Sequence, residues 1–269
     1  MSTPYFYFDK KELQERAEHY SSAYTTATPF PHVLIDNFFP ESVLEQVLEE
    51  FPSPEEISWT EFSSPAENRK LSAEDDEQMG PYTRHLLAQC NSASFLSFLE
   101  KLTGIEALIP DPYFRGGGLH QTLQGGLLGI HADFNRYKKL NLHRRINVLV
   151  YLNKNWKEEY GGHLELWETK MTHCVKKVSP VFNRFVAFST TDTAYHGHPD
   201  PLLCPPDMSR KSIALYYYTV ADRNVAPAHT TLFKERPGKD SFTQKTWRSF
   251  AKRFIPPILL DLWNVVRAR

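Results

Sequence analysis

The chain has 269 residues and a mass of 31.2 kDa, with 31 Lys and Arg against 32 Asp and Glu. This balance leaves no overall field that would attract nucleic acid or an anionic membrane. With 41% hydrophobic and 13% aromatic residues, the composition is that of a globular protein and excludes a disordered one. The cysteines Cys90, Cys174 and Cys204 form no CxxC pair, which argues against a disulfide framework and a zinc–thiolate site.

The N-terminal segment has charged residues where a secretory signal would need an unbroken apolar stretch. No run approaches the roughly 20 apolar residues that a membrane-spanning helix requires. We therefore expect a cytoplasmic protein in a reducing compartment, with no transmembrane segment.

The chain begins with alternating helical and extended patterns. Asp9 is expected to cap a short surface helix over residues 9–20, which are rich in good helix formers. Residues 32–39 have the pattern of a buried strand, and residues 40–51 that of a helix with a proline near its start.

Residues 52–80 mix proline, serine and acidic residues without periodicity. This composition predicts an exposed loop that can serve as a lid over a site. A second helical stretch is expected over residues 81–102, with an interruption at Asn91 and Ser92.

From residue 116 onwards, short β-branched and aromatic runs alternate with glycine, proline and asparagine, as in a barrel or jelly roll. We predict one mainly β domain with N-terminal helices. Residues 1–115 form the supporting region, residues 116–222 the jelly-roll core and residues 223–269 a C-terminal extension. The extension ends in an amphipathic segment, which favours packing on the protein's own core over a membrane or partner contact.

His131 and Asp133 follow an apolar run, and on a strand two side chains at this spacing share a face. His196 follows another apolar run and would complete a set of two histidines and one carboxylate. This set binds non-haem iron(II) and leaves coordination positions open. Taken alone, His131 and Asp133 are also compatible with a surface turn. His198 is the rival third ligand and would face the same side as His196.

Arg210 lies at the start of an aromatic-rich strand, fourteen residues after His196. A guanidinium fork there could bind the far end of a dicarboxylate with two hydrogen bonds. Lys211 is the alternative for this role.

A cluster of basic residues flanks the His131 motif. Such clusters are typical of a solvated face, and the alternative is contact with an acidic substrate. Its members are Arg136, Lys138, Lys139, Arg144 and Arg145.

Five motifs occur in the order found in a known family. They are HAD (131–133), YLN (151–153), GGHLELW (161–167), FVAFSTTDTAYHGHPDPL (185–202) and RKSIALYYYT (210–219). Together they span about half of the chain and resemble the iron(II)- and 2-oxoglutarate-dependent oxygenases, in particular the prolyl 4-hydroxylase-like branch. The resemblance implies a double-stranded β-helix, which is a cupin-like jelly-roll barrel.

The resemblance also implies a chemistry. His131, Asp133 and His196 would bind Fe(II), and 2-oxoglutarate would chelate the metal as cosubstrate. O2 would convert the cosubstrate to succinate and yield an oxidant that hydroxylates a C–H bond of a substrate. The cofactor supplies the reactivity and the protein positions the reactants.

For the cosubstrate, the resemblance assigns the distal carboxylate of 2-oxoglutarate to Arg210 and Tyr151. Gln121, ten residues before His131, and Asn147 are expected to line the same pocket. Among the other histidines, His120 has the best case for a role because it neighbours Gln121.

The sequence leaves the substrate, the regiochemistry and the oligomeric state open. One alternative is the same chemistry on a small molecule or a carbohydrate-linked metabolite instead of a peptidyl residue. A wide groove beside the metal would favour a peptide, and a closed pocket under residues 52–80 would favour a small molecule. Another alternative is a non-catalytic metal-binding barrel that serves as a sensor or scaffold. Zinc-dependent hydrolysis is disfavoured because it gives Arg210 and Tyr151 no task.

Overall fold

A computed structural model describes residues 6–221 and 227–238 of the chain. The predicted C-terminal amphipathic segment lies outside the described residues. The helices are α1 (Lys10–Thr26), α2 (Glu41–Glu49), α3 (Pro81–Cys90) and α4 (Ala93–Thr103), with short 3₁₀ turns η1 (Asp76–Gln78) and η2 (Glu158–Tyr160).

Capping residues explain where these helices begin and end. The Asp9 carboxylate accepts a hydrogen bond from the Glu12 backbone N–H (2.9 Å), which confirms the predicted cap, although α1 runs further than expected. The interruption at Asn91 and Ser92 is also confirmed, because Ser92 caps a separate helix, α4. No helix in the described part of the chain is both long and apolar enough to cross a membrane.

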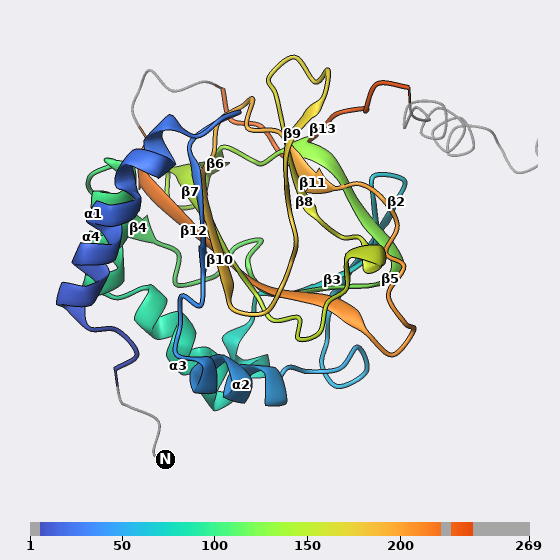
Figure 1. Cartoon of the computed structure of the whole chain (residues 1–269), viewed down its shortest axis with the longest axis horizontal. Coiled ribbons are helices and arrows are strands. Elements are labelled where there is room, and N and C mark those ends of the chain that lie inside the picture. The colour runs from blue at the N-terminus through green and yellow to red at the C-terminus, as the bar shows by residue number, and fades with distance from the viewer. Residues whose placement is uncertain (1–5, 222–226, 239–269) are drawn as a thin grey trace, which may run out of the picture.

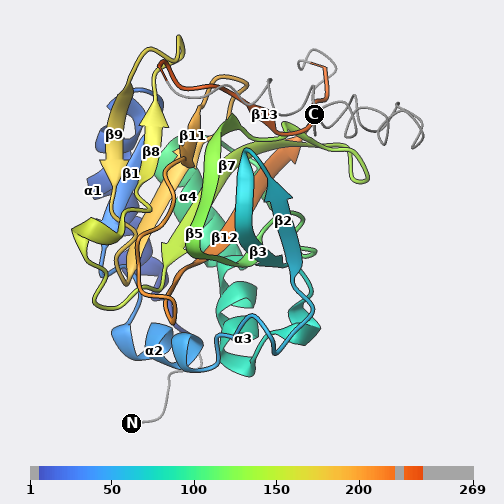
Figure 2. The same ribbon diagram turned by 90° about the vertical axis from the view of Figure 1, so that its right-hand side faces the viewer.

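The strands pair antiparallel in one curled sheet (Figures 1 and 2). They are β1 (His32–Asp36), β2 (Thr60–Ser64), β3 (Glu67–Ala73), β4 (Ile109–Pro110), β5 (Gly118–Ala132), β6 (Arg136–Tyr137), β7 (Leu142–Tyr151), β8 (Leu164–Trp167), β9 (Cys174–Val178), β10 (Arg184–Ser189), β11 (His196–His198), β12 (Ser209–Val220) and β13 (Leu232–Phe233). Their order is β1-β10-β7-β12-β5-β11-β8-β9, and β3 and β13 also pair with β5. This is the predicted double-stranded β-helix with N-terminal helices.

Residues 52–80 do not form the predicted irregular loop. They contain the hairpin of β2 and β3, and β3 pairs with β5. The pattern was missed because β2 lies at an edge with both faces largely exposed, so its sequence lacks apolar alternation.

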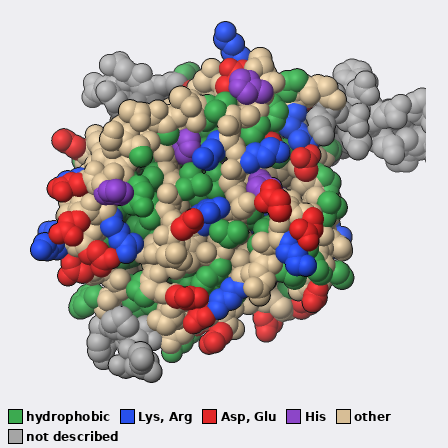
Figure 3. Space-filling model, in the orientation of Figure 1, with side chains coloured by type: hydrophobic (Ala, Val, Ile, Leu, Met, Phe, Trp, Pro, Cys, Tyr) green, Lys and Arg blue, Asp and Glu red, His purple; other side chains and the backbone are tan. Residues whose placement is uncertain are grey.

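The main core lies between the helices and one face of the sheet. Alternate residues of β7, β10 and β12 face the helices, and the residues between them face the barrel interior. Phe95 and Phe98 of α4 pack against Phe185 of β10, and all three side chains are fully buried. This packing fixes three strands whose other face forms a wall of the site. On the surface drawn in Figure 3, acidic and basic side chains are interspersed.

Candidate functional site

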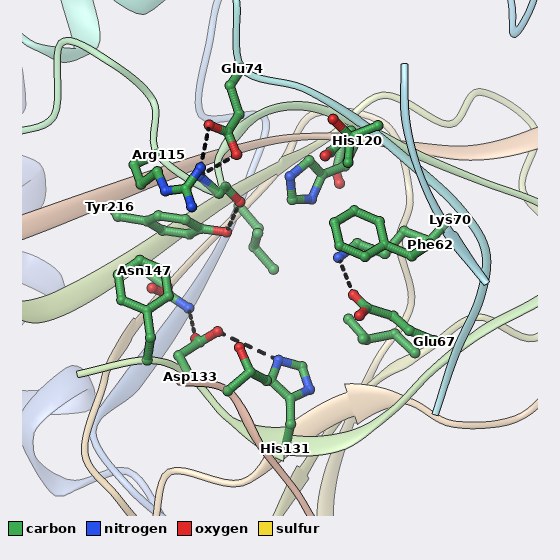
Figure 4. A pocket seen from close by; sticks show the side chains of 18 of the residues that line it. Phe62, Glu67, Lys70, Glu74, Arg115, His120, His131, Asp133, Asn147 and Tyr216 are labelled. Carbon is green, nitrogen blue, oxygen red and sulfur yellow. Dashed lines mark hydrogen bonds and ion pairs between the residues drawn. The ribbon is translucent and has the colours of Figure 1, made fainter. Parts of the chain in front are cut away.

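A cavity of about 830 Å³ opens into the barrel, between the β2–β3 hairpin and the strands β5, β7, β11 and β12. Figure 4 shows side chains converging on it from opposite walls, with His131 and Asp133 on one side and Lys70 and His120 on the other. The described structure therefore brings residues from five distant parts of the sequence to one space.

His131, Asp133 and His196 meet at this cavity. His131 on β5 and His196 on β11 are direct partners across the antiparallel pair, and Asp133 follows the end of β5. Nε2 of His131 lies 3.5 Å from Oδ1 of Asp133, and Nε2 of His196 lies 3.4 Å from Oδ2. One ligand atom from each residue lies within 4.8 Å of the others, so the three can bind a single ion.

The backbone fixes the orientation of both histidine rings. Nδ1 of His131 contacts the Gly129 carbonyl oxygen at 2.9 Å, and Nδ1 of His196 contacts the Ala194 carbonyl oxygen at 2.9 Å. Because a carbonyl oxygen only accepts, each Nδ1 carries the proton and each Nε2 keeps its lone pair for a metal. Burial, and then the neighbouring His131, lowers the pKa of His196 to about 4, which keeps this ring neutral at neutral pH.

Arg144 and Asn147 hold the Asp133 carboxylate. Nη2 of Arg144 lies 3.1 Å from Oδ2 of Asp133, and Asn147 donates to the same oxygen (2.6 Å) while it accepts from Nε of Arg144 (2.8 Å). Burial by itself raises the pKa of Asp133, but Arg144 and then His196 more than offset it and hold the pKa well below its ordinary value. Asp133 is therefore an anion, as a metal ligand must be.

Arg144 was expected on a solvated face, and that expectation is wrong. Its side chain is 1% exposed, and its guanidinium lies 3.4 Å from the centre of the Tyr216 ring. The sequence signal is weak because β7 is irregular between Arg144 and Ile146, so simple alternation does not show which face Arg144 occupies.

Arg210 lines the same cavity and is 6% exposed. Its Nε donates to the Gly162 carbonyl oxygen (2.7 Å), and Nη2 donates to the Tyr151 hydroxyl (3.1 Å). No acidic residue in the described part of the chain pairs with it. Lys211 does not line the cavity and lies near the Phe51 ring, because adjacent residues on a strand face opposite sides.

Tyr151 is fully buried and contacts the cavity only through Arg210. Gln121 does not line the cavity, contrary to expectation, and its side chain binds the Ser209 hydroxyl and the Pro52 carbonyl. The cause is a bulge: His196 pairs with His131 and His198 with Leu128, so β5 has an extra residue there. Counting back from His131 across the bulge therefore gives the wrong face.

His120 and His198 form the inner wall in place of Gln121. Nε2 of His120 and Nδ1 of His198 are buried with no hydrogen-bond partner, and both residues line the cavity. Burial, and then Lys70, lowers the pKa of His120 to about 3, and burial with Arg210 lowers that of His198 well below its usual range. His198 thus lies on the same side as His196, as predicted, but outside the cluster that can hold an ion.

The residues present fit an iron(II) ion and a dicarboxylate. The Nε2 atoms of His131 and His196 and the Asp133 carboxylate are donors of the types that iron(II) accepts. Arg210 offers an unpaired guanidinium within the same cavity, which a carboxylate group would neutralise.

Comparisons with known proteins point to the same chemistry. Residues 117–218 match the model of the 2OG-Fe(II) oxygenase superfamily. No curated protein matches the chain in sequence.

Three solved structures share the fold. One is a prolyl hydroxylase from Trichoplax adhaerens, in complex with a peptide fragment of the hypoxia inducible factor oxygen degradation domain (19% identity, 77% of this chain, 91% of that chain, TM-score 0.57). Another is a prolyl-4-hydroxylase from Pseudomonas putida (14% identity, 76% of this chain, 98% of that chain, TM-score 0.52). A third is HygX from Streptomyces hygroscopicus with nickel, 2-oxoglutarate and hygromycin B bound (12% identity, 76% of this chain, 93% of that chain, TM-score 0.50).

Proposed function

We propose that this chain is a dioxygenase that uses iron(II), 2-oxoglutarate and O2 to hydroxylate a C–H bond of its substrate. The match of residues 117–218 to the model of the 2OG-Fe(II) oxygenase superfamily supports this proposal. In this proposal His131, Asp133 and His196 are the iron ligands, and Arg210 binds the distal carboxylate of 2-oxoglutarate. The observation that carries it is the presence of the three ligand residues and an unpaired, buried Arg210 in one cavity.

When bound, iron(II) and 2-oxoglutarate would activate O2 and supply the electrons for its reduction. The chain's own residues supply position and charge. Arg144 and Asn147 keep Asp133 ionised and oriented, and the Gly129 and Ala194 carbonyls keep both imidazole Nε2 atoms aimed at the ion site.

Aromatic rings limit water at the ion site. The Phe233 ring lies 5.5 Å from the His131 ring, and the Phe188 ring lies 4.7 Å from the His196 ring, measured between centroids. Phe233 belongs to β13, which pairs with β5 beside His131. Apolar walls of this kind strengthen the electrostatic interactions within the site.

At the cosubstrate end, Tyr151 is a positioning residue for Arg210. Its hydroxyl accepts from Nη2, and its ring lies 4.9 Å from the guanidinium carbon. Together with the Gly162 carbonyl, Tyr151 fixes the plane of the guanidinium and leaves other N–H groups for a carboxylate. His120, in place of Gln121, is the further polar residue of this pocket, with Asn147 nearer the ion.

The similarity in fold to the Trichoplax adhaerens enzyme, solved with a peptide, supports a prolyl-hydroxylase-like reaction on a peptidyl substrate. The similarity in fold to HygX, solved with hygromycin B, supports the same chemistry on a small molecule. A non-catalytic barrel is disfavoured because it would have no use for an unpaired Arg210 beside an intact set of ligands.

Succinate release from 2-oxoglutarate, measured with and without iron(II), tests the proposal. His131→Ala and Asp133→Ala should each lower iron-dependent release by on the order of a hundredfold or more, because each removes a ligand. His173→Ala, at an exposed residue, is the matched control. Wild-type release by either ligand variant would contradict the assignment.

A further inference from the structure

The wall of the cavity is more basic than the chain as a whole. Seven Lys and Arg residues line it against four Asp and Glu, whereas the whole chain has 31 against 32. Charges of both signs are interspersed on the surface in Figure 3. Low-dielectric walls focus the electric field of this excess positive charge into the cavity, where it attracts anions.

Three acidic residues of the wall each neutralise one cation. The pairs are Lys70 with Glu67 (2.8 Å), Arg115 with Glu74 (3.4 Å) and Arg144 with Asp133 (3.1 Å). The fourth acidic residue, Asp75, accepts hydrogen bonds from the Glu77 backbone N–H and the Gln78 amide. Within the described structure, the acidic residues of the wall are therefore all engaged.

Four cations of the wall have no acidic partner among the described residues. Arg210 is one, and the proposed function assigns it to 2-oxoglutarate. The others are Arg136, Lys138 and Lys139, which follow the proposed ligand Asp133 closely in sequence. Lys138 and Lys139 are exposed and Arg136 is half-buried, so these three mark the outer end of the cavity.

Backbone pairing fixes the turn that carries these three cations. β6 pairs with the start of β7, with Arg136 opposite His143, and the Lys138 carbonyl accepts from the Asn141 backbone N–H (3.3 Å) to close the turn. Nε of Arg136 is buried and has no hydrogen-bond partner. Nζ of Lys139 lies 5.0 Å from the centre of the Tyr113 ring. A buried donor without a partner costs free energy, which an anion at this position would relieve.

We propose that the substrate carries an anionic group, a carboxylate or a phosphate, that binds Arg136, Lys138 and Lys139 at the outer end of the cavity. The carbon to be oxidised then reaches the His131, Asp133 and His196 centre at the inner end. This inference rests on the proposed function and specifies its substrate class. It also gives Arg136, Lys138 and Lys139 of the basic cluster the role of contact with an acidic substrate. Arg144 instead holds Asp133, and Arg145 lies outside the cavity and bonds Thr219.

The test is a calorimetric titration of the full chain, loaded anaerobically with iron(II) and saturated with 2-oxoglutarate so that Arg210 is occupied. The probes are hexaglutamate for an acidic peptide, fructose 1,6-bisphosphate for a small phosphorylated molecule, and hexalysine as the cationic control. We expect one anionic probe to bind and hexalysine not to bind. Binding of hexaglutamate identifies a peptidyl source of the anion, and binding of the bisphosphate a small-molecule source.

The variant R136A/K138A/K139A should weaken binding of the anionic probe about tenfold or more. K138E/K139E should also weaken binding of the anionic probe about tenfold or more. Because this variant changes only exposed residues, a loss of binding would not reflect a failure to fold. The matched control K10A/K170A/K176A removes three exposed lysines outside the cavity and should bind as wild type does.

Failure of both anionic probes to bind the wild type, or equal binding of the anionic probe by R136A/K138A/K139A, would overturn the inference. Binding of 2-oxoglutarate is measured before any probe is added. Failure at that earlier step would count against the proposed function, whereas intact 2-oxoglutarate binding without anion binding would count against the substrate class alone.

Discussion

Arg144 and Asp133 form a buried ion pair. A metal ion bound by Asp133 would add positive charge to this pair. Arg144 lies 3.1 Å from the Asp133 carboxylate and is the largest of the charges that lower its pKa, so it is the principal counter-charge of Asp133 in the metal-free protein. Removal of one partner from a buried pair leaves an uncompensated charge, at a cost of about 3–5 kcal/mol. A metal ion bound by Asp133 would supply a replacement positive charge.

Arg144→Met should therefore destabilise the metal-free protein by about 3 kcal/mol, and iron(II) should restore part of that loss. Thermal unfolding with and without anaerobic iron(II) measures both effects. Arg145→Met is the control, because Arg145 is adjacent and bonds Thr219 instead of the carboxylate. A smaller iron-induced stabilisation in Arg144→Met than in wild type would count against this account.

At the scale of strands, the approach of β11 to β5 brings His196 beside His131. Gly197 makes that approach close: a Cβ there would lie 2.6 Å from the Gly129 carbonyl oxygen and 2.7 Å from that of Leu128. These carbonyls belong to strand backbone and have little freedom to move. A side chain at Gly197 would therefore push the strands apart and misplace both histidines.

Gly197→Ala should lower the affinity for iron(II) by about tenfold or more, in the range found when support of metal ligands is lost. Equilibrium metal binding measures it. Gly161→Ala is a useful comparison, because a Cβ there meets open space and only its positive φ of 69° is strained. That variant should lose about 1 kcal/mol of stability with unchanged metal affinity. Unchanged affinity in Gly197→Ala would contradict the role of the close approach.

The pairing of β1 with β10 includes an ion pair that responds to pH. Arg184 donates to both Asp36 oxygens, at 2.6 and 2.8 Å, and these hydrogen bonds lower the pKa of Asp36 below 3.8. As pH falls, the Asp36 carboxylate is therefore protonated at a higher pH in the unfolded chain than in the folded protein. The contribution of the pair to stability is present above the ordinary pKa and is lost as pH falls through the lower, folded value.

Asp36→Asn should lower the free energy of unfolding at pH 7 by about 0.5 kcal/mol, as expected for an exposed pair. The difference from wild type should shrink as pH falls through the folded pKa of Asp36. Urea unfolding from pH 7 to pH 2.5 would show whether the two curves converge. Parallel curves over that range would mean that the pair does not carry this pH dependence.

At the scale of the whole molecule, the sequence predicts the features that depend on local patterns. The cap at Asp9, the break before Ser92 and the run of strands from residue 116 each have a signal within a few residues. The proximity of His131 and His196 is also predictable, since the apolar runs before them become strands that pair.

The remainder depends on contacts that no local pattern encodes. The β2–β3 hairpin pairs through β3 with β5, which lies far along the chain. The face of β5 on which Gln121 lies depends on a bulge near His131. Arg144 likewise lies beyond an irregularity in β7. One extra residue in a strand reverses the face of all side chains beyond it, so alternation predicts faces only between bulges.

The most direct test of the account is an anaerobic titration of the iron(II)-loaded protein with 2-oxoglutarate, followed through the weak visible charge-transfer band that chelation of iron(II) by the keto acid produces. We predict a saturable band for the wild type. Arg210→Ala should need about tenfold or more 2-oxoglutarate for the same band while it still binds iron, because the variant loses only the partner of the distal carboxylate. If iron binds but no band appears, or if Arg210→Ala titrates as wild type does, the assignment of the cavity to iron and 2-oxoglutarate is contradicted.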